Sequence, residues 1–142
     1  PKRRGQTRVR ELRDAGITVA FGSDCVMDPW YSLGCADMLD VAFMGLHAGQ
    51  LSSREDMAWC FEAVTENSAK IMGLEKYGLR VGCNANFNIL QARNSIEAIR
   101  LRAHRISIIR NGRIIASNPA ITTNLSLAGR PKVVNPANFA PK

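Results

Sequence analysis

The chain has 142 residues, of which 46% are hydrophobic, and a formal net charge of +7 with a pI near 9.8. No apolar run approaches the roughly 20 residues that cross a bilayer, and residues 1–16 lack the apolar centre of a signal peptide. We therefore expect a soluble, cytoplasmic protein of about one domain, with no membrane segment.

The basic surplus raises a second class of function, a basic interaction or nucleic-acid-binding module without catalysis. Such a module loses affinity steeply between about 50 and 200 mM salt. The arginines are spread over the opening segment, residues 93–113 and the tail, without interleaved aromatic residues. This spread makes nucleic acid the less favoured partner, and an acidic segment absent from this chain would balance the charge equally well.

The first part of the chain predicts the end of an α/β repeat. Residues 6–15 suit an amphipathic helix that Gly16 would cap. The short apolar run Ile17 to Phe21 follows, which is typical of a fully buried parallel strand. A helix, a glycine and a buried strand in this order make half of a βαβ unit.

Three helices are expected after a polar and aromatic loop at residues 22–34. Apolar residues recur at helical spacing over residues 36–51. Ser53, with Asp56 three residues later, predicts a capped start for the next helix. A third helix, ENSAKIMGL, should end at Gly73.

From about residue 75 the pattern changes to short strands, at 85–91, 105–110 and 113–116. Asn111 and Gly112 between the last two predict a tight hairpin, and SIEAIRLRA suits one or two helical turns. The tail from residue 118 holds four of the six prolines and should be extended. The predicted architecture is incomplete, because one buried parallel strand needs neighbours on both sides.

The four cysteines lie far apart, with no Cys-x-x-Cys pair, which argues against a disulfide framework or a zinc knuckle. We expect three of them to be small buried hydrophobes, namely Cys35, Cys60 and Cys83. Cys25 differs, because it directly follows Asp24.

Asp24 stands where the predicted strand ends, which is where active sites gather in parallel α/β folds. A carboxylate at this place is able to bind a metal, act as a general base, or do both. The alternative is that Asp24 or Asp28 caps a turn, with Pro29 setting the chain direction. The residues by themselves leave both interpretations open.

A family resemblance favours the first interpretation. The stretch FGSDCVMDPWYSLG, continuing into ADMLDVAFMGLHAGQL, resembles the last barrel strand and following loop of the cytosine deaminase group in the amidohydrolase superfamily. TENSAKIMGLEKYGLRVGCNANFNIL resembles that superfamily's exit from barrel to β-sandwich, and RISIIRNGRIIA its closing strands. PKRRG resembles the approach to the last strand. The likeness runs from about Pro1 to about Thr123 and is most specific in DPWYSLG.

The resemblance implies an α/β fold that is the C-terminal portion of a metal-dependent hydrolase TIM barrel, followed by part of a small β-sandwich. Residues 1–74 would end the barrel and include its eighth strand, residues 75–117 would belong to the sandwich, and residues 118–142 would form an extended tail. We expect the parent protein to be a hydrolase acting on the C–N bonds of cyclic amidines. The chain alone should be inactive.

By the same resemblance, Asp24 matches the aspartate that binds one divalent metal and carries the proton of the attacking water. Trp30 and Cys25 match substrate-binding positions. Cys25 departs from the family pattern, because a second acidic residue often follows the metal aspartate there and a thiol cannot replace its charge. Isocytosine or an aminotriazine therefore becomes as plausible a substrate as cytosine.

The remaining metal ligands of the family are histidines on barrel strands that this chain lacks. The chain has two histidines, His47 in a helix and His104 in the β unit, and both suit structural roles. Iron, zinc or manganese would suit the parent's site, and this chain alone is expected to hold none. The expected partners are the missing N-terminal segment, a small aminopyrimidine or triazine, and further copies in a homo-oligomer.

Overall fold

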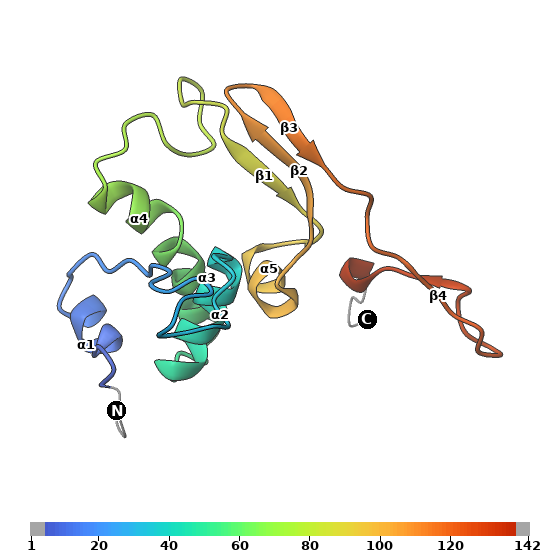
Figure 1. Cartoon of the computed structure of the whole chain (residues 1–142), viewed down its shortest axis with the longest axis horizontal. Helices are drawn as coiled ribbons and strands as arrows, with labels where there is room; N and C mark the ends of the chain where they lie inside the picture. Colours follow the sequence, from blue (N-terminus) through green and yellow to red (C-terminus); the bar gives the residue numbers. More distant parts are fainter. Residues whose placement is uncertain (1–4, 139–142) are drawn as a thin grey trace. The chain divides into compact units, whose positions relative to one another are not determined.

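The computed structural model describes residues 5–138, so Pro1 to Arg4 of the PKRRG stretch lie outside the described residues. The chain divides into two compact units, Pro1–Gly78 and Leu79–Lys142. In their described parts, unit 1 holds four helices, and unit 2 holds one helix, a short 3₁₀ turn and two small sheets (Figure 1). Among the described residues, no helix is both long and apolar enough to cross a membrane.

Helix α1 spans Val9–Asp14, inside the predicted range 6–15. The helix ends as predicted at Gly16, whose φ of 77° lies in the left-handed region that glycine adopts without strain. The backbone N–H of Ile17 then returns to the carbonyl of Leu12 at 3.0 Å. This return satisfies a carbonyl that the helix end would otherwise leave unpaired.

The prediction of a buried strand at Ile17–Phe21 is wrong for this chain as it stands. The segment belongs to neither sheet of the described structure, and Ile17 is 52% exposed. A β-strand is defined by hydrogen bonds to a neighbouring strand, and the described residues offer none beside this segment. Phe21 at its end is packed against Trp59 and Gly45 of the helical part of unit 1.

The three predicted helices of unit 1 are confirmed, with small shifts of their ends. Helix α2 spans Met38–Ala48, α3 spans Arg54–Ala63 and α4 spans Glu66–Ile71. The carboxylate of Asp37 accepts the N–H of Leu39 at 2.8 Å and caps α2. Helix α3 packs on both α2 and α4. The apolar residues that these contacts bury are Leu39, Ala42, Leu51, Cys60, Ala63 and Ala69.

One expectation for the cysteines fails. Cys60 is fully buried in α3, but Cys35 is exposed and Cys83 is half-buried. Cys35 lies in the long loop that precedes α2, outside the packed helix faces. Burial follows the surroundings of a thiol more than its intrinsic hydrophobicity.

Asp56 is a buried charge at the start of α3, and its side chain is only 4% exposed. Its Oδ2 accepts the N–H of Ser53 at 3.3 Å while Ser53 Oγ accepts the N–H of Asp56 at 3.0 Å, which completes the predicted cap of α3. Two arginines of α1 reach the same carboxylate: Arg13 binds Oδ1 at 2.5 Å and Arg10 binds Oδ2 at 3.1 Å. Asp56 therefore ties α1 to the start of α3.

Unit 2 contains the predicted hairpin. Strands β1 (Phe87–Leu90), β2 (Arg105–Arg110) and β3 (Arg113–Ser117) form an antiparallel sheet in the order β1-β2-β3. Asn111 and Gly112 have φ values of 49° and 73°, as a tight turn between twisted strands requires. Helix α5 (Ser95–Leu101) joins β1 to β2 and buries Ala98 and Ile99.

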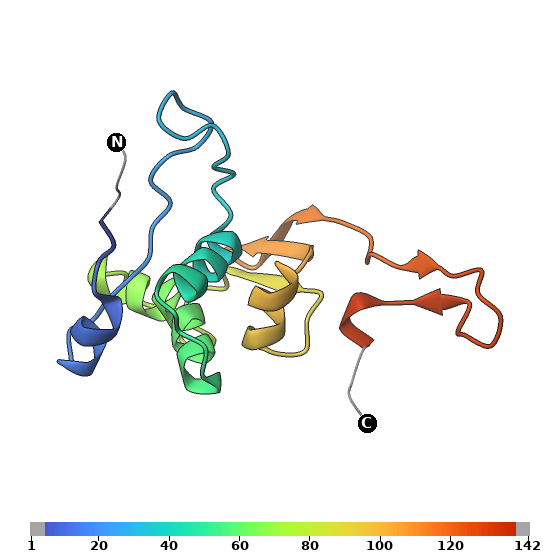
Figure 2. The same ribbon diagram turned by 90° about the horizontal axis from the view of Figure 1, so that it is seen from below.

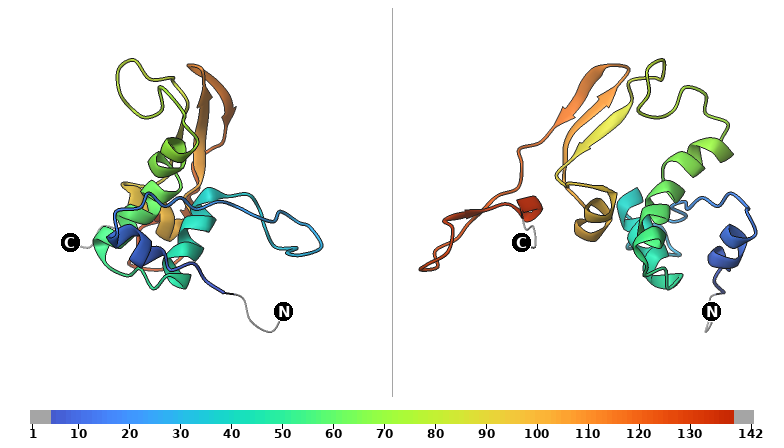
Figure 3. Two further views of the ribbon diagram at one scale, coloured as in Figure 1. Left: turned by 90° about the vertical axis from the view of Figure 1, so that its left-hand side faces the viewer. Right: turned by 180° about the vertical axis from the view of Figure 1, so that it is seen from behind.

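The tail is more ordered than the predicted extended segment. Strands β4 (Thr123–Asn124) and β5 (Val133–Val134) pair as a short antiparallel ribbon, seen at the C-terminal end in Figure 3, and a 3₁₀ turn follows at Pro136–Asn138. The buried side chain of Gln91 holds this tail: its Nε2 donates to Ile121 O at 2.7 Å and to Asn135 Oδ1 at 2.9 Å. The side chain of Gln91 thus joins two parts of the tail to the end of β1.

Replacing Asp56 by Asn should lower the free energy of unfolding at pH 7 by about 1–3 kcal/mol, because two arginines lose a buried ionic acceptor. Urea titrations at pH 7 and pH 3 measure this, with the exposed neighbour Glu55→Gln as the matched control.

The pH dependence has a definite sign. Hydrogen bonding, chiefly from Arg13, holds the pKa of Asp56 well below its ordinary value. Its contribution is complete above the unfolded pKa of about 3.9 and declines as the pH falls below that value, because the unfolded chain takes up the proton first. The difference in the free energy of unfolding between wild type and Asp56→Asn should therefore be smaller at pH 3 than at pH 7. An equal difference at both pH values would contradict this role of Asp56.

Candidate functional site

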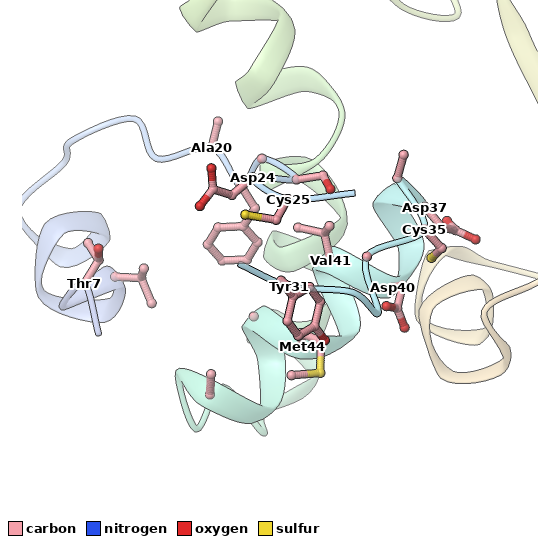
Figure 4. Close-up of a pocket in the computed structure, with 18 of the residues that line it drawn as sticks. Thr7, Ala20, Asp24, Cys25, Tyr31, Cys35, Asp37, Asp40, Val41 and Met44 are labelled. Atoms are coloured by element: carbon pink, nitrogen blue, oxygen red, sulfur yellow. The ribbon is translucent and has the colours of Figure 1, made fainter. Parts of the chain in front are cut away.

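A cavity of about 560 Å³ lies in unit 1, beside the segment that precedes and includes Asp24. Residues 19–25 line one part of it, and Thr7, Val9, the returning end of the loop and one face of α2 line the rest (Figure 4). The loop itself projects away from the helices of unit 1 (Figure 2). The cavity therefore brings together the end of an apolar segment and the base of a long loop.

Asp24 lies on the lining of this cavity and is exposed to it. Phe21, three residues earlier, anchors the segment: its ring meets Trp59 of α3 edge-on, with the centroids 5.6 Å apart. Gly45 of α2 makes room for that ring, because a Cβ at residue 45 would lie 2.5 Å from it. The packed ring of Phe21 thus fixes the chain three residues before the exposed carboxylate of Asp24.

Asp28, and not Asp24, caps the turn in the loop. Its Oδ1 accepts the backbone N–H groups of Trp30 at 2.8 Å and of Tyr31 at 3.0 Å. These bonds, that of Tyr31 first, hold the pKa of Asp28 below its ordinary value. The turn-capping alternative is therefore confirmed for Asp28, and the described structure shows Asp24 in no such turn.

The two ends of the loop meet at Gly34. A Cβ on this residue would lie 1.8 Å from the carbonyl oxygen of Cys25, which is backbone and has little room to move. A residue with a side chain cannot occupy position 34 without opening the loop. Gly34 therefore closes the base of the loop next to Asp24.

Cys25 is half-buried and lines the cavity beside Asp24. Hydrogen bonding to Asp28, with burial and the nearby charge of Asp24 as further causes, raises the pKa of the thiol to about 11. The side chain is therefore a neutral thiol at pH 7. It presents a weak donor to the cavity where a carboxylate would present a charge.

The structure distinguishes the two aromatic residues of the loop. Trp30 is 81% exposed and does not line the cavity, so its substrate-binding role stays a prediction. Tyr31, its neighbour, does line the cavity. The family resemblance singled out Trp30 and gave Tyr31 no role, so the place of Tyr31 on the cavity lining is a finding that sequence reasoning missed.

The described residues do not form a metal centre by themselves. Within residues 5–138 no group of three or more His, Cys, Asp or Glu side chains is arranged to hold a metal ion. His47 bonds through Nδ1 to the carbonyl of Phe43 at 2.8 Å, and His104 bonds through Nε2 to the carbonyl of Pro119 at 3.1 Å. The metal-binding role of Asp24 therefore stays a prediction, and within residues 5–138 no further ligands are arranged around it.

Comparison with known proteins identifies relatives. Residues 1–116 match the model of the family described as "Amidohydrolase family". The chain is 32% identical over 114 residues to the N-isopropylammelide isopropyl amidohydrolase of Pseudomonas sp. (strain ADP), a match that covers 80% of this chain and 28% of that protein. It is also 32% identical over 117 residues to the pterin deaminase of Rhizobium rhizogenes, covering 81% of this chain and 26% of the relative.

A solved structure is also similar. The crystal structure of 5-methylcytosine deaminase from Klebsiella pneumoniae, liganded with 5-fluorocytosine, superposes with a TM-score of 0.79 at 43% sequence identity. The match covers 85% of this chain and 30% of that chain. The chain thus spans less than a third of the length of the relatives that it matches.

Replacing Asp28 by Asn should lower the pKa of Cys25 from about 11 toward its ordinary value, because the carboxylate that stabilises the neutral thiol is gone. The amide oxygen of Asn still accepts the two loop N–H bonds, so the turn is retained. Alkylation of the Cys25 peptide at pH 8, followed by mass spectrometry, should be severalfold faster than in wild type. Asp40→Asn, which alters another carboxylate of the same cavity, is the control; equal rates in both variants would contradict the assignment.

Proposed function

Because the chain belongs to the amidohydrolase family, we propose that it is the C-terminal part of a metal-dependent aminohydrolase that deaminates a cytosine-like or related amino-substituted heterocycle. The observation that carries this proposal is the position of Asp24. Its exposed carboxylate lines a cavity at the end of an apolar segment, within a region 43% identical to a 5-methylcytosine deaminase.

The fold of the complete protein belongs to the same proposal. Residues 17–21 would become the last strand of a (β/α)8 barrel once neighbouring strands from the missing N-terminal segment lie beside them. In this arrangement residues 1–74 end the barrel, residues 75–117 contribute to a β-sandwich, and residues 118–142 are an appended tail. Two features of unit 1 support this proposal. Residues 17–21 have no strand beside them in the described structure, and the loop at residues 22–34 is largely exposed.

Asp24 is the residue that we propose to be both metal ligand and catalytic group. A divalent ion, iron, zinc or manganese, would lower the pKa of a bound water in the complete site. Oδ1 or Oδ2 of Asp24 would accept one proton of that water as the water oxygen bonds to the ring carbon, and would donate it to the amine nitrogen. The C–N bond then breaks, ammonia leaves as a neutral molecule, and the second proton of the water ends on the ring nitrogen as the carbonyl forms. One carboxylate cannot retain such an ion, so the missing segment must supply the other ligands.

The cavity lining bears on the substrate. Cys25 places a neutral thiol beside Asp24, and Tyr31 adds a phenol from the same loop. Position 25 itself supplies no negative charge for an amide edge of the ring, so isocytosine and an aminotriazine are proposed on equal terms with cytosine. Trp30 would contribute only if its exposed ring turns toward the bound base. A homo-oligomer of the complete protein is part of the same proposal.

The complete protein with Asp24→Asn should lose at least about 100-fold in the rate of ammonia release, because an amide accepts no proton at neutral pH. Ammonia release from cytosine, isocytosine and an aminotriazine measures this, together with metal content per chain. Glu62→Gln removes an exposed carboxylate of α3 outside the cavity and should change the rate little. Retained turnover in Asp24→Asn would remove the residue from the mechanism.

A second function is favoured by one observation, the uneven distribution of charge. From Leu79 onward the chain carries ten of its nineteen Lys and Arg residues but a single acidic residue, Glu97. Arg100 binds the carboxylate of Glu97 at 2.7 Å. A basic unit of this kind attracts polyanions through counterion release.

A binding measurement decides on this second function. If unit 2 binds nucleic acid, the affinity of the chain for a DNA duplex should fall by about 1000-fold or more between 50 and 200 mM salt. The Arg110→Gln/Arg113→Gln variant, altered at the paired ends of β2 and β3, should bind more weakly. Affinity that is absent, or that ignores salt, would exclude this function.

A further inference from the structure

The segment that carries Asp24 is held along one side by the junction of two helices. The N–H of Phe21 donates to the carbonyl of Ala63, the last residue of α3, at 2.9 Å. The side-chain Nδ2 of Asn67, in the first turn of α4, donates to the carbonyl of Val19 at 3.0 Å. The second bond joins residues 48 positions apart in the sequence.

These two bonds act together. Alternate residues of an extended chain direct their backbone groups to the same side, so Val19 and Phe21 present a carbonyl and an N–H to the same helix junction. The carbonyl of Ala63 is one of those that a helix end leaves without an intrahelical partner. The junction therefore supplies one acceptor and one donor, at the spacing that the segment needs.

The contacts lie close to the proposed catalytic group. Phe21 precedes Asp24 by three residues, and its ring is held between Trp59 and Gly45. The backbone bonds set the position of the segment along its length, and the ring sets its distance from α2 and α3. No sheet restrains residues 17–21 in the described structure, so the side-chain amide of Asn67 has a function that a neighbouring strand would otherwise share.

We propose that Asn67 is a positioning residue for Asp24: its amide fixes the carbonyl of Val19 and thereby sets where the carboxylate stands in the cavity. This inference rests on the proposed function only for the role of Asp24. The hydrogen bond and its effect on residues 19–24 do not depend on which reaction the complete protein performs.

The first test uses this chain. Asn67→Asp keeps the shape of the side chain but replaces the donating Nδ2 by an oxygen that repels the carbonyl of Val19. Amide hydrogen exchange at Phe21 should become about tenfold faster. The amide of Ala69, bonded within α4 to Thr65, should keep its protection and shows that the helices remain folded. Asn88→Asp, the same change on the exposed strand β1, is the matched control.

The second test uses the complete protein and a variant that restores the donor. Asn67→Asp should lower kcat about 10- to 100-fold with KM nearly unchanged, because the carboxylate is misplaced while the rest of the cavity is retained. Bound metal per chain should also fall. Asn67→His, whose ring Nδ1–H takes the place of the amide donor, should recover most of the kcat and of the slow exchange at Phe21.

The outcomes separate the two proposals. If amide exchange at Phe21 is as slow in Asn67→Asp as in the unaltered chain, the positioning role is wrong. The role is also wrong if exchange becomes faster while kcat and the bound metal of the complete protein stay the same. If the unaltered complete protein releases no ammonia from any of the three substrates, the proposed function fails. The exchange rates and the bound metal would then decide the role of Asn67 by themselves.

Discussion

The described structure of unit 1 depends on one buried carboxylate. Asp56 accepts bonds from its own helix cap and from two arginines of α1, so it fixes α1 against the start of α3. The chain that leaves α1 begins at Gly16. It runs along the junction of α3 and α4 as far as Asp24. Taking a carboxylate out of water is costly unless such partners surround it. Arg13 also lies over the ring of Trp59, 5.3 Å from its centroid, which joins the ionic contact to the apolar anchor of Phe21.

A second constraint shapes the cavity: the two ends of the loop at residues 22–34 approach each other closely at Cys25 and Gly34. Gly34 permits its backbone to approach that of Cys25 closely. Asp28 caps the turn within the loop by accepting the N–H groups of Trp30 and Tyr31. Both devices are local, and together they keep Asp24 and Cys25 beside α2 although the loop has few apolar contacts. The same bonding leaves Cys25 a neutral thiol. The electrostatic character of the cavity is therefore set by the turn as well as by the residues that line it.

The two units differ in what stabilises them. Unit 1 combines helix packing with a buried ionic cluster, and among the described residues no strand lies beside residues 17–21. Unit 2 is a three-stranded sheet with one helix, and it holds its tail through the side chain of Gln91. The family match ends at residue 116, just before this tail begins. The tail ribbon is therefore a feature of this chain beyond the part that the family model describes.

Local signals in the sequence determined most elements: the cap formed by Ser53 and Asp56, the hairpin at Asn111 and Gly112, and the end of α1 at Gly16 were all predicted, because a few adjacent residues decide them. The motif FGSDCVMDPWYSLG likewise determined the family. Only the tertiary structure decided that residues 17–21 lie against helices without a strand beside them, that Tyr31 lines the cavity, and that Asn67 reaches Val19. These outcomes depend on which distant groups lie nearby once the chain has folded, and no local pattern of residues carries that information.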